Sequence, residues 1–187
     1  MAIYAISDLH LSKAVPNKSM ELFGKDWENY EQRLDENWRK TVKDTDTVLI
    51  PGDISWAIDL NEAYEDFAYI DSLPGNKIIL KGNHDYWLST MSKLKEFAKK
   101  YNSISFLHNN SFEYEGIGIC GTRGWITEPG QPEDIKVLNR EVGRLKASIA
   151  SSSASEKIVF LHYPPVFGNI ECKEITSVLE ENNIKKC

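Results

Sequence analysis

Short apolar runs alternate along the chain with longer stretches in which apolar residues recur every three or four positions. The short runs are mostly followed by turn residues, a pattern that predicts buried β-strands. Strands are expected at Ile3–Ile6, Thr47–Ile50, Ile78–Leu80, Ser103–Leu107 and Lys157–Leu161, with a hairpin of Phe112–Tyr114 and Ile117–Cys120 around Glu115 and Gly116.

The longer stretches predict helices with an apolar face and a charged face. They are Trp27–Val42, Leu60–Leu73, Leu88–Phe97, Ile135–Ile149 and Ile175–Leu179. Trp27 and Trp38 are expected to face the core from the first helix. Ser89 or Thr90 is expected to cap the third helix at its N-terminus.

The order of these elements predicts an α/β sandwich. Strands alternate with helices, and the first three strands are nearly continuous apolar runs, so the sheet should be covered on both faces and joined by right-handed crossovers. The hairpin adds an antiparallel part or a second sheet. Because the chain has 187 residues and no internal repeat or composition shift, we expect a single domain over residues 1–187.

Composition and charge limit the expected partners. The formal net charge of −6 argues against a broad nucleic-acid interface, which needs a basic face. A small phosphorylated substrate stays compatible with this charge, because bound cations can reverse the local field. No apolar window approaches the roughly 18 residues of a membrane span, and the N-terminus does not resemble a secretory signal. We therefore expect no membrane partner.

The cysteines indicate the compartment. Cys120, Cys172 and Cys187 are odd in number and include no Cys-x-x-Cys pair. They fit a protein of the reducing cytoplasm without a disulfide framework, so we expect a cytoplasmic protein.

Side chains able to bind metal follow four of the predicted strands. Asp8 and His10 follow the first strand, Asp53 follows the second, and Asn83 and His162 follow two later ones. Ligands of open α/β sheets bind at the carboxyl ends of strands, and three of the four histidines lie in these stretches. The sequence therefore predicts a shared site.

The residue types indicate which ions this site would take. Asp8 and His10 are two positions apart, so in an extended segment they point the same way and can reach one ion. Asp53 has two carboxylate oxygens and can bridge two ions, while Asn83 and His162 offer an amide oxygen and an imidazole nitrogen. Such mixed ligands suit Mn²⁺, Fe or Zn²⁺ better than Ca²⁺. Each motif taken alone also fits an ordinary turn or strand end. Because all of them occur in this order, each after an apolar strand, metal binding is the favoured interpretation.

The same motifs resemble those of the calcineurin-like metallophosphoesterases. The resemblance covers residues 1 to about 165 and rests on Asp8-Leu9-His10, Gly52-Asp53, Gly82-Asn83-His84-Asp85 and His162. It implies two facing mixed β-sheets flanked by helices, with a dinuclear centre of divalent metal ions (Mn, Fe or Zn).

The resemblance also implies a role for each residue. By this resemblance, Asp8 and His10 bind the first ion and Asp53 bridges both ions. Asn83 and His162 bind the second ion. His84 is implied as a catalytic histidine that binds no metal, and that stabilises the phosphoryl group or protonates the leaving oxygen. Asp85 is expected to orient His84.

Two departures from the family pattern narrow the expected function. Family phosphoprotein phosphatases extend the second motif to Gly-Asp-x-x-Asp-Arg-Gly, whereas Gly52-Asp53 is followed here by Ile54-Ser55-Trp56-Ala57-Ile58, which favours another branch. The final Gly-His-x-His motif of the family is absent before Cys187, so we expect a C-terminally incomplete domain. Each metal would then lack a fourth protein ligand, and metal binding and hydrolysis should be weak.

Arg123 is a candidate for binding the substrate phosphate, because it follows an apolar run and carries a fork-shaped guanidinium. A surface or ion-paired arginine is the open alternative. Trp56, Trp87 and Trp125 each follow a motif strand, and are expected either to wall the substrate pocket or to pack in the core.

These features predict a metal-dependent phosphoester hydrolase, a phosphatase or phosphodiesterase, that uses a metal-activated water. Two alternatives stay open: a non-catalytic binding module with the same fold, and a nuclease of the same superfamily. The acidic charge balance counts against the nuclease. The missing final histidines favour the binding module, whereas the intact His84 opposes it.

Overall fold

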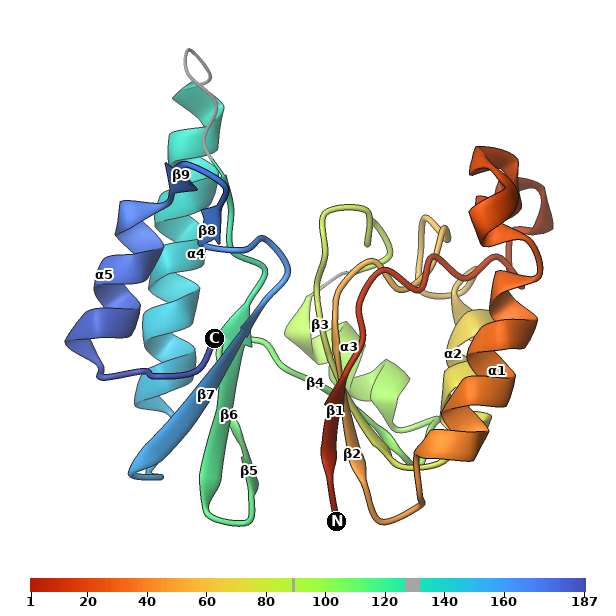
Figure 1. Cartoon of the computed structure of the whole chain (residues 1–187), viewed down its shortest axis with the longest axis horizontal. Helices are drawn as coiled ribbons and strands as arrows, with labels where there is room; N and C mark the ends of the chain where they lie inside the picture. Colours follow the sequence, from red (N-terminus) through yellow and green to blue (C-terminus); the bar gives the residue numbers. More distant parts are fainter. Residues whose placement is uncertain (89, 127–131) are drawn as a thin grey trace. The chain divides into compact units, whose positions relative to one another are not determined.

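The chain divides into two units, Met1–Phe106 and Leu107–Cys187, and each has its own strands and helices (Figure 1). Each unit also has its own hydrophobic core. This computed structural model describes residues 1–88, 90–126 and 132–187. The expectation of a single domain over residues 1–187 stays a prediction.

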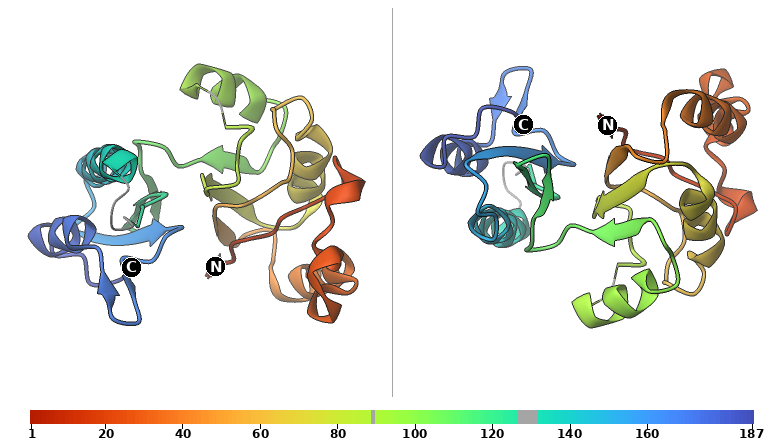
Figure 2. Two further views of the ribbon diagram at one scale, coloured as in Figure 1. Left: turned by 90° about the horizontal axis from the view of Figure 1, so that it is seen from above. Right: turned by 90° about the horizontal axis from the view of Figure 1, so that it is seen from below.

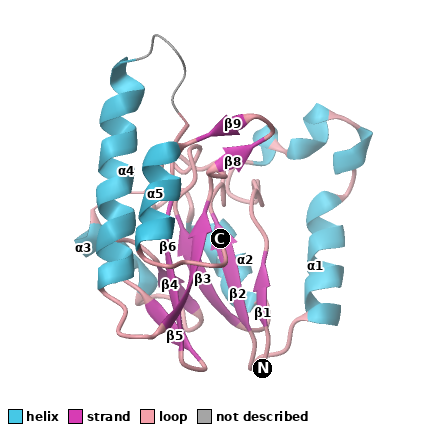
Figure 3. Ribbon diagram, turned by 60° about the vertical axis from the view of Figure 1, so that its left-hand side comes forward, coloured by secondary structure: helices cyan, strands magenta, loops and turns pink. Residues whose placement is uncertain are grey.

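Four parallel strands form the sheet of the first unit, in the order β1-β2-β3-β4. They are β1 (Ile3–Ala5), β2 (Thr47–Pro51), β3 (Asn76–Leu80) and β4 (Ile104–Phe106). Parallel neighbours need a crossover, which is usually helical. The crossovers carry α1 (Tyr30–Thr41), α2 (Tyr64–Ser72) and α3 (Met91–Ala98). The carboxyl ends of the strands therefore meet at one edge of the sheet (Figure 3).

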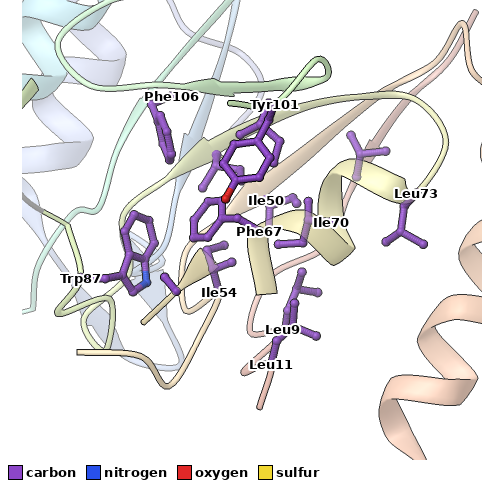
Figure 4. Packing of buried hydrophobic residues seen from close by; sticks show 14 of the residues in the cluster. Leu9, Leu11, Ile50, Ile54, Phe67, Ile70, Leu73, Trp87, Tyr101 and Phe106 are labelled. Carbon is purple, nitrogen blue, oxygen red and sulfur yellow. The ribbon is translucent and has the colours of Figure 1, made fainter. Parts of the chain in front are cut away.

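The core of the first unit is built around an aromatic cluster (Figure 4). Phe67 of α2 is fully buried, and its ring lies 4.9 Å from the ring of Trp87 and 5.1 Å from that of Phe97. Both contacts are edge-to-face, an arrangement that aromatic rings prefer. Trp38 of α1 is buried in the same core, as predicted, so all three helices pack on it.

The first helix begins later than its apolar spacing predicts. Three 3₁₀ turns precede it, η1 (Pro16–Lys18), η2 (Met20–Phe23) and η3 (Lys25–Trp27). α1 starts only at Tyr30, because Asn29 adopts a left-handed conformation (φ 51°) that a right-handed helix cannot include. Trp27 lies before this break and is half-buried, so the prediction that it faces the core from the helix is wrong.

Side-chain hydrogen bonds set the starts of the next two helices. α2 begins at Tyr64 and not at Leu60, because the Asp59 carboxylate accepts the backbone N–H groups two and three residues further on, at 2.8 and 3.0 Å, and forms a turn. Thr90 is confirmed as the cap of α3, since its hydroxyl oxygen accepts the N–H three residues on at 3.4 Å. Ser89, the other predicted cap, lies outside the described residues.

The second unit contains a mixed sheet of β5 (Phe112–Tyr114), β6 (Ile117–Thr122) and β7 (Glu156–Leu161). β5 and β6 form the predicted hairpin, and β7 pairs in parallel with β6. The helices α4 (Pro132–Ala150) and α5 (Lys173–Glu181) lie on the same side of β6 and β7 (Figure 2). A small hairpin of β8 (Val166–Phe167) and β9 (Ile170–Glu171) has no counterpart in the prediction, because two-residue strands are too short to show a period.

The predicted α/β class with helix-flanked sheets is confirmed. The sheet of the first unit is parallel throughout, and that of the second is mixed because β5 runs against β6. Within the described ranges, no helix is both long enough and apolar enough to cross a membrane.

Candidate metal centre

The chain segments that leave β1 and β2 continue side by side beyond the sheet. The backbone N–H of Asp8 donates to the carbonyl oxygen of Gly52 at 3.1 Å, and that of His10 donates to the carbonyl oxygen of Asp53 at 2.9 Å. These bonds hold the first motif against the second. The first two strand ends therefore share a site, as the parallel order predicts.

Asp8, His10 and Asp53 all have a left-handed backbone, with φ of 58°, 42° and 54°. Seven residues other than glycine have positive φ in the described ranges, and these are three of them. Such conformations cost about 1 kcal/mol or more each and cluster at functional sites. They also correct the expectation that Asp8 and His10 point the same way because they alternate along an extended segment. β1 ends at Ala5, and the two side chains converge through left-handed turns beyond the strand.

The side chains of these three residues converge on one point. His10 Nε2 lies 3.8 Å from Asp8 Oδ1 and 3.6 Å from Asp53 Oδ2, and one ligand atom of each residue lies within 4.8 Å of the others. His10 and Asp53 are buried, whereas the Asp8 side chain is 50% exposed, so the group is reachable from one side. Two carboxylates and an imidazole form a mixed oxygen and nitrogen donor set that fits a transition metal or zinc.

The loop after β3 brings the third motif to the same group. The backbone N–H of His84 donates to Asp53 Oδ1 at 2.9 Å. This approach requires glycine at position 82, because a Cβ atom there would lie 2.0 Å from Asp53 Oδ1 and 2.4 Å from the Asp53 nitrogen. The side chains of Asn83 and His84 are half-buried.

We expect Gly82→Ala to lower the free energy of unfolding by roughly 1–3 kcal/mol, because the added methyl group must displace Asp53. Urea unfolding followed by tryptophan fluorescence measures this loss. Gly143→Ala is the matched control, since a Cβ atom at Gly143 meets nothing within 4 Å and alanine is the better residue inside α4. Equal effects of the two substitutions would contradict the close approach of Gly82 to Asp53.

Asp85 is fully buried, and its carboxylate accepts four hydrogen bonds. Oδ2 accepts from the backbone N–H groups of Asp53 at 2.8 Å and Gly82 at 2.7 Å. Oδ1 accepts from the backbone of Ile54 at 2.8 Å and from the indole of Trp87 at 2.9 Å. Burial raises the pKa of Asp85, and the backbone N–H groups counteract that rise.

This arrangement changes the role expected of Asp85. A carboxylate has about four lone-pair positions, and four donors fill those of Asp85. The expectation that Asp85 orients His84 is therefore wrong. Asp85 instead ties the loop that carries Asp53 to the loop that carries His84.

An aromatic wall lies against the cluster. The Trp56 indole stacks on the His10 ring with centroids 4.7 Å apart at an angle of 24°, and its centroid lies 5.6 Å from that of the His84 ring. The Tyr86 ring lies 6.3 Å from the His84 ring at an angle of 83°. Trp87, by contrast, is a core residue with 1% exposure (Figure 4). Trp87 is thus a core residue, whereas Trp56 is half-buried beside the cluster and its role in a substrate pocket stays a prediction.

Tyr30, the first residue of α1, contacts the backbone of the site through its hydroxyl group. Its hydroxyl donates to the carbonyl oxygen of His10 at 2.7 Å. Burial raises the pKa of the Tyr30 phenol, which keeps it protonated as a donor. Sequence reasoning missed this contact, because Tyr30 showed only the spacing of an apolar helix position.

Arg123 and His162 belong to the second unit, where they follow β6 and β7. The backbone N–H groups of His162 and Tyr163 donate to the carbonyl oxygen of Arg123, at 3.1 and 2.8 Å. The Arg123 guanidinium is 3.5 Å from the buried Glu141 carboxylate and 4.5 Å from the centre of the Trp125 ring. The structure thus shows Arg123 as an ion-paired arginine, and Trp125 packs beneath it.

The structure brings three predicted ligands together with the His84 loop inside the first unit. Metal binding by these three residues and catalysis by His84 stay predictions, and so do the other predicted roles. These are metal binding by Asn83 and His162, and phosphate binding by Arg123.

Comparison with known proteins identifies the family. The family model described as calcineurin-like phosphoesterase matches residues 1–185, so the chain belongs to this family. An uncharacterized protein of Methanocaldococcus jannaschii is 28% identical over 126 residues, which cover 66% of this chain. The match spans 65% of that relative, slightly less than two thirds of its length.

Two solved structures also match the chain. A protein of unknown function from Aquifex aeolicus is 22% identical with a TM-score of 0.49, covering 100% of this chain and 89% of that chain. Another structure is 15% identical with a TM-score of 0.51, covering 98% of this chain and 80% of that chain. The second likeness indicates a shared fold.

Proposed function

We propose that this chain is a metal-dependent phosphoester hydrolase, either a phosphatase or a phosphodiesterase. The observation that carries the proposal is the convergence of Asp8, His10 and Asp53, whose ligand atoms lie within 4.8 Å of one another. Membership of the calcineurin-like phosphoesterase family supports the same class of reaction.

Asp8, His10 and one oxygen of Asp53 are the proposed ligands of a first divalent ion. Mn²⁺, Fe or Zn²⁺ bound there would lower the pKa of a water molecule and neutralise charge on the phosphoryl oxygens. The stacked Trp56 ring limits rotation of the His10 imidazole. The Tyr30 hydroxyl donates to the His10 backbone carbonyl, so both the ring and the backbone of His10 are held in place before any ion arrives.

His84 is the proposed general acid. Its backbone is fixed on Asp53 Oδ1, and its ring lies 5.8 Å from the His10 ring, so it sits next to the proposed ligands without being one. In the reaction a water oxygen bonds to phosphorus, the P–O ester bond breaks, and the His84 imidazolium donates its proton to the leaving oxygen. The water gives up a proton to solvent, and the imidazole takes one back.

Turnover of p-nitrophenyl phosphate and its bis-ester tests this proposal. With Mn²⁺ added, we expect p-nitrophenol to be released from at least one ester, and a chelator should stop the release. His84→Ala is expected to lower kcat by roughly 10²–10⁴-fold without changing Mn²⁺ affinity, because His84 gives a proton and binds no ion.

Other outcomes favour the alternatives. A non-catalytic binding module would bind Mn²⁺ and leave both esters intact, and a nuclease would cleave nucleic acid in preference to either ester. Hydrolysis that continues unchanged with chelator present, or in His84→Ala, would overturn the proposed mechanism.

A further inference from the structure

A pocket of about 670 Å³ opens in the first unit between α3 and the loops that follow the second and third motifs. We call it the α3 pocket. Its volume lies in the range of roughly 300–1,000 Å³ that is typical of small-molecule sites. Residues of its lining that matter here are Ile58, Asp59, Tyr86, Lys93, Glu96 and Lys100.

The α3 pocket begins next to the proposed centre. Tyr86 follows the third motif, and its ring lies 6.3 Å from the His84 ring at an angle of 83°. Ile58 belongs to the same loop as Trp56, which stacks on His10. A phosphoester whose phosphorus lies beside His84 would therefore extend its organic part toward this pocket.

The walls nearest the centre are apolar and open. Ile58 is 60% exposed and Tyr86 is 66% exposed, although both loops are pinned. The backbone N–H of Tyr86 donates to the carbonyl oxygen of His84 at 2.8 Å, and that of Ile58 donates to the Glu62 carboxylate at 2.6 Å. Two large apolar side chains are thus held in solvent at one pocket, a feature typical of ligand sites.

The lining of the α3 pocket carries no net negative charge, since its two carboxylates are matched by two lysines, so it does not repel an anionic ester. Its two carboxylates are engaged, since Asp59 accepts backbone N–H groups and Glu96 pairs with Lys99 at 2.7 Å. Lys93 and Lys100 add two positive charges to the lining. Lys100 Nζ lies 5.6 Å from the centre of the Phe97 ring, so the basic and aromatic surfaces adjoin.

A second pocket of the first unit, of about 680 Å³, suits such a ligand less well. Four carboxylates line it, with Lys13 as the one cation among its described lining residues, and Lys13 pairs with Glu31 at 3.0 Å. The carboxylates are those of Glu21, Glu31, Asp35 and Glu36. Four carboxylates against one lysine leave an excess of negative charge among these lining residues, which would repel a phosphoester.

We propose that the α3 pocket binds a planar aromatic substituent of the phosphoester, with the ring packed on Tyr86 and Ile58. This inference rests on the proposed function, because the metal centre must hold the phosphoryl end. It deepens that function by naming the substrate class as aromatic phosphoesters.

Isothermal titration of the Mn²⁺-loaded chain with methylphosphonate and phenylphosphonate tests the inference. Both probes offer a similar anionic group, cannot be hydrolysed, and differ in the ring. We expect phenylphosphonate to bind about tenfold more tightly, the ratio that corresponds to one good aromatic contact of about 1.4 kcal/mol.

Variants locate that preference. Tyr86→Ala and Ile58→Ser are each expected to reduce the preference for phenylphosphonate and to leave the affinity for methylphosphonate unchanged. Phe23→Ala is the matched control, because Phe23 is 69% exposed in the same unit but does not line the α3 pocket. It should keep the full preference.

Two results would overturn the inference. If both probes bind equally to the wild-type chain, or if the preference survives in Tyr86→Ala and Ile58→Ser, the α3 pocket does not bind the ring while the proposed metal centre stands. If neither probe binds, the metal centre fails and the inference fails with it.

Discussion

Replacing Asp85 by alanine is expected to remove a large part of the stability of the first unit. The substitution leaves four donors without their acceptor, three on the backbone and one on the Trp87 indole. Each buried donor that loses its partner costs about 1–3 kcal/mol, so we expect a total loss of roughly 4 kcal/mol or more. A domain has a free energy of unfolding of only about 5–15 kcal/mol.

Urea unfolding measures this loss, with the fluorescence of the buried tryptophans as the signal. Asp35→Ala is the control, because Asp35 is an accessible carboxylate paired with Arg39 on the surface of α1. Its unfolding midpoint should stay at the wild-type value, since exposed ion pairs contribute little. An Asp85→Ala chain as stable as the wild type would show that the four hydrogen bonds do not hold the two motif loops together.

The arrangement of the first unit follows from local patterns. The apolar runs Thr47–Ile50 and Ile78–Leu80 are separated by a stretch with the apolar spacing of a helix. This order predicts parallel strands whose sheet is covered by the helix. Parallel order then brings the strand ends to one edge, whatever the details of the loops. This is why the grouping of Asp8 and His10 with Asp53 could be predicted before any geometry was known.

The geometry of the loops could not be predicted in the same way. Left-handed backbone at Asp8, His10 and Asp53 depends on contacts between loops that are far apart in sequence, and those residue types permit it without requiring it. The partners of Asp85 include the backbone of residues 53 and 54, more than thirty positions earlier. Because any residue except proline supplies a backbone N–H, the sequence carries no signal for such a partner.

A similar limit applies to the start of α1 and to the role of Tyr30. Apolar spacing extends through Trp27, but a single left-handed residue, Asn29, ends the regular backbone before α1. The asparagine is a weak signal, since it tolerates that conformation and also occurs inside helices. Tyr30 has the spacing of a core residue and uses its hydroxyl for the His10 backbone, which periodicity cannot reveal.

The central claim is that the Asp8, His10 and Asp53 group binds a divalent ion, and Asp53→Asn separates this role from folding. Asparagine has the same shape, adopts left-handed backbone more readily than most residues, and keeps a carbonyl oxygen for the His84 N–H. The fold should therefore be retained. The variant loses one negative charge and one strong ligand oxygen, and loss of a direct ligand should exceed the roughly 10–100-fold effect of changing an outer-shell partner.

Mn²⁺ binding measured by equilibrium dialysis for the wild type, Asp53→Asn and Asp35→Asn tests the claim most directly. Asp35→Asn removes the same charge from the same unit outside the metal group, so it controls for the general field. We predict that wild type and Asp35→Asn bind Mn²⁺ alike, and that Asp53→Asn binds at least about 100-fold more weakly at an unchanged unfolding midpoint. Equal Mn²⁺ affinity in all three chains, or no binding to the wild type, would contradict the account.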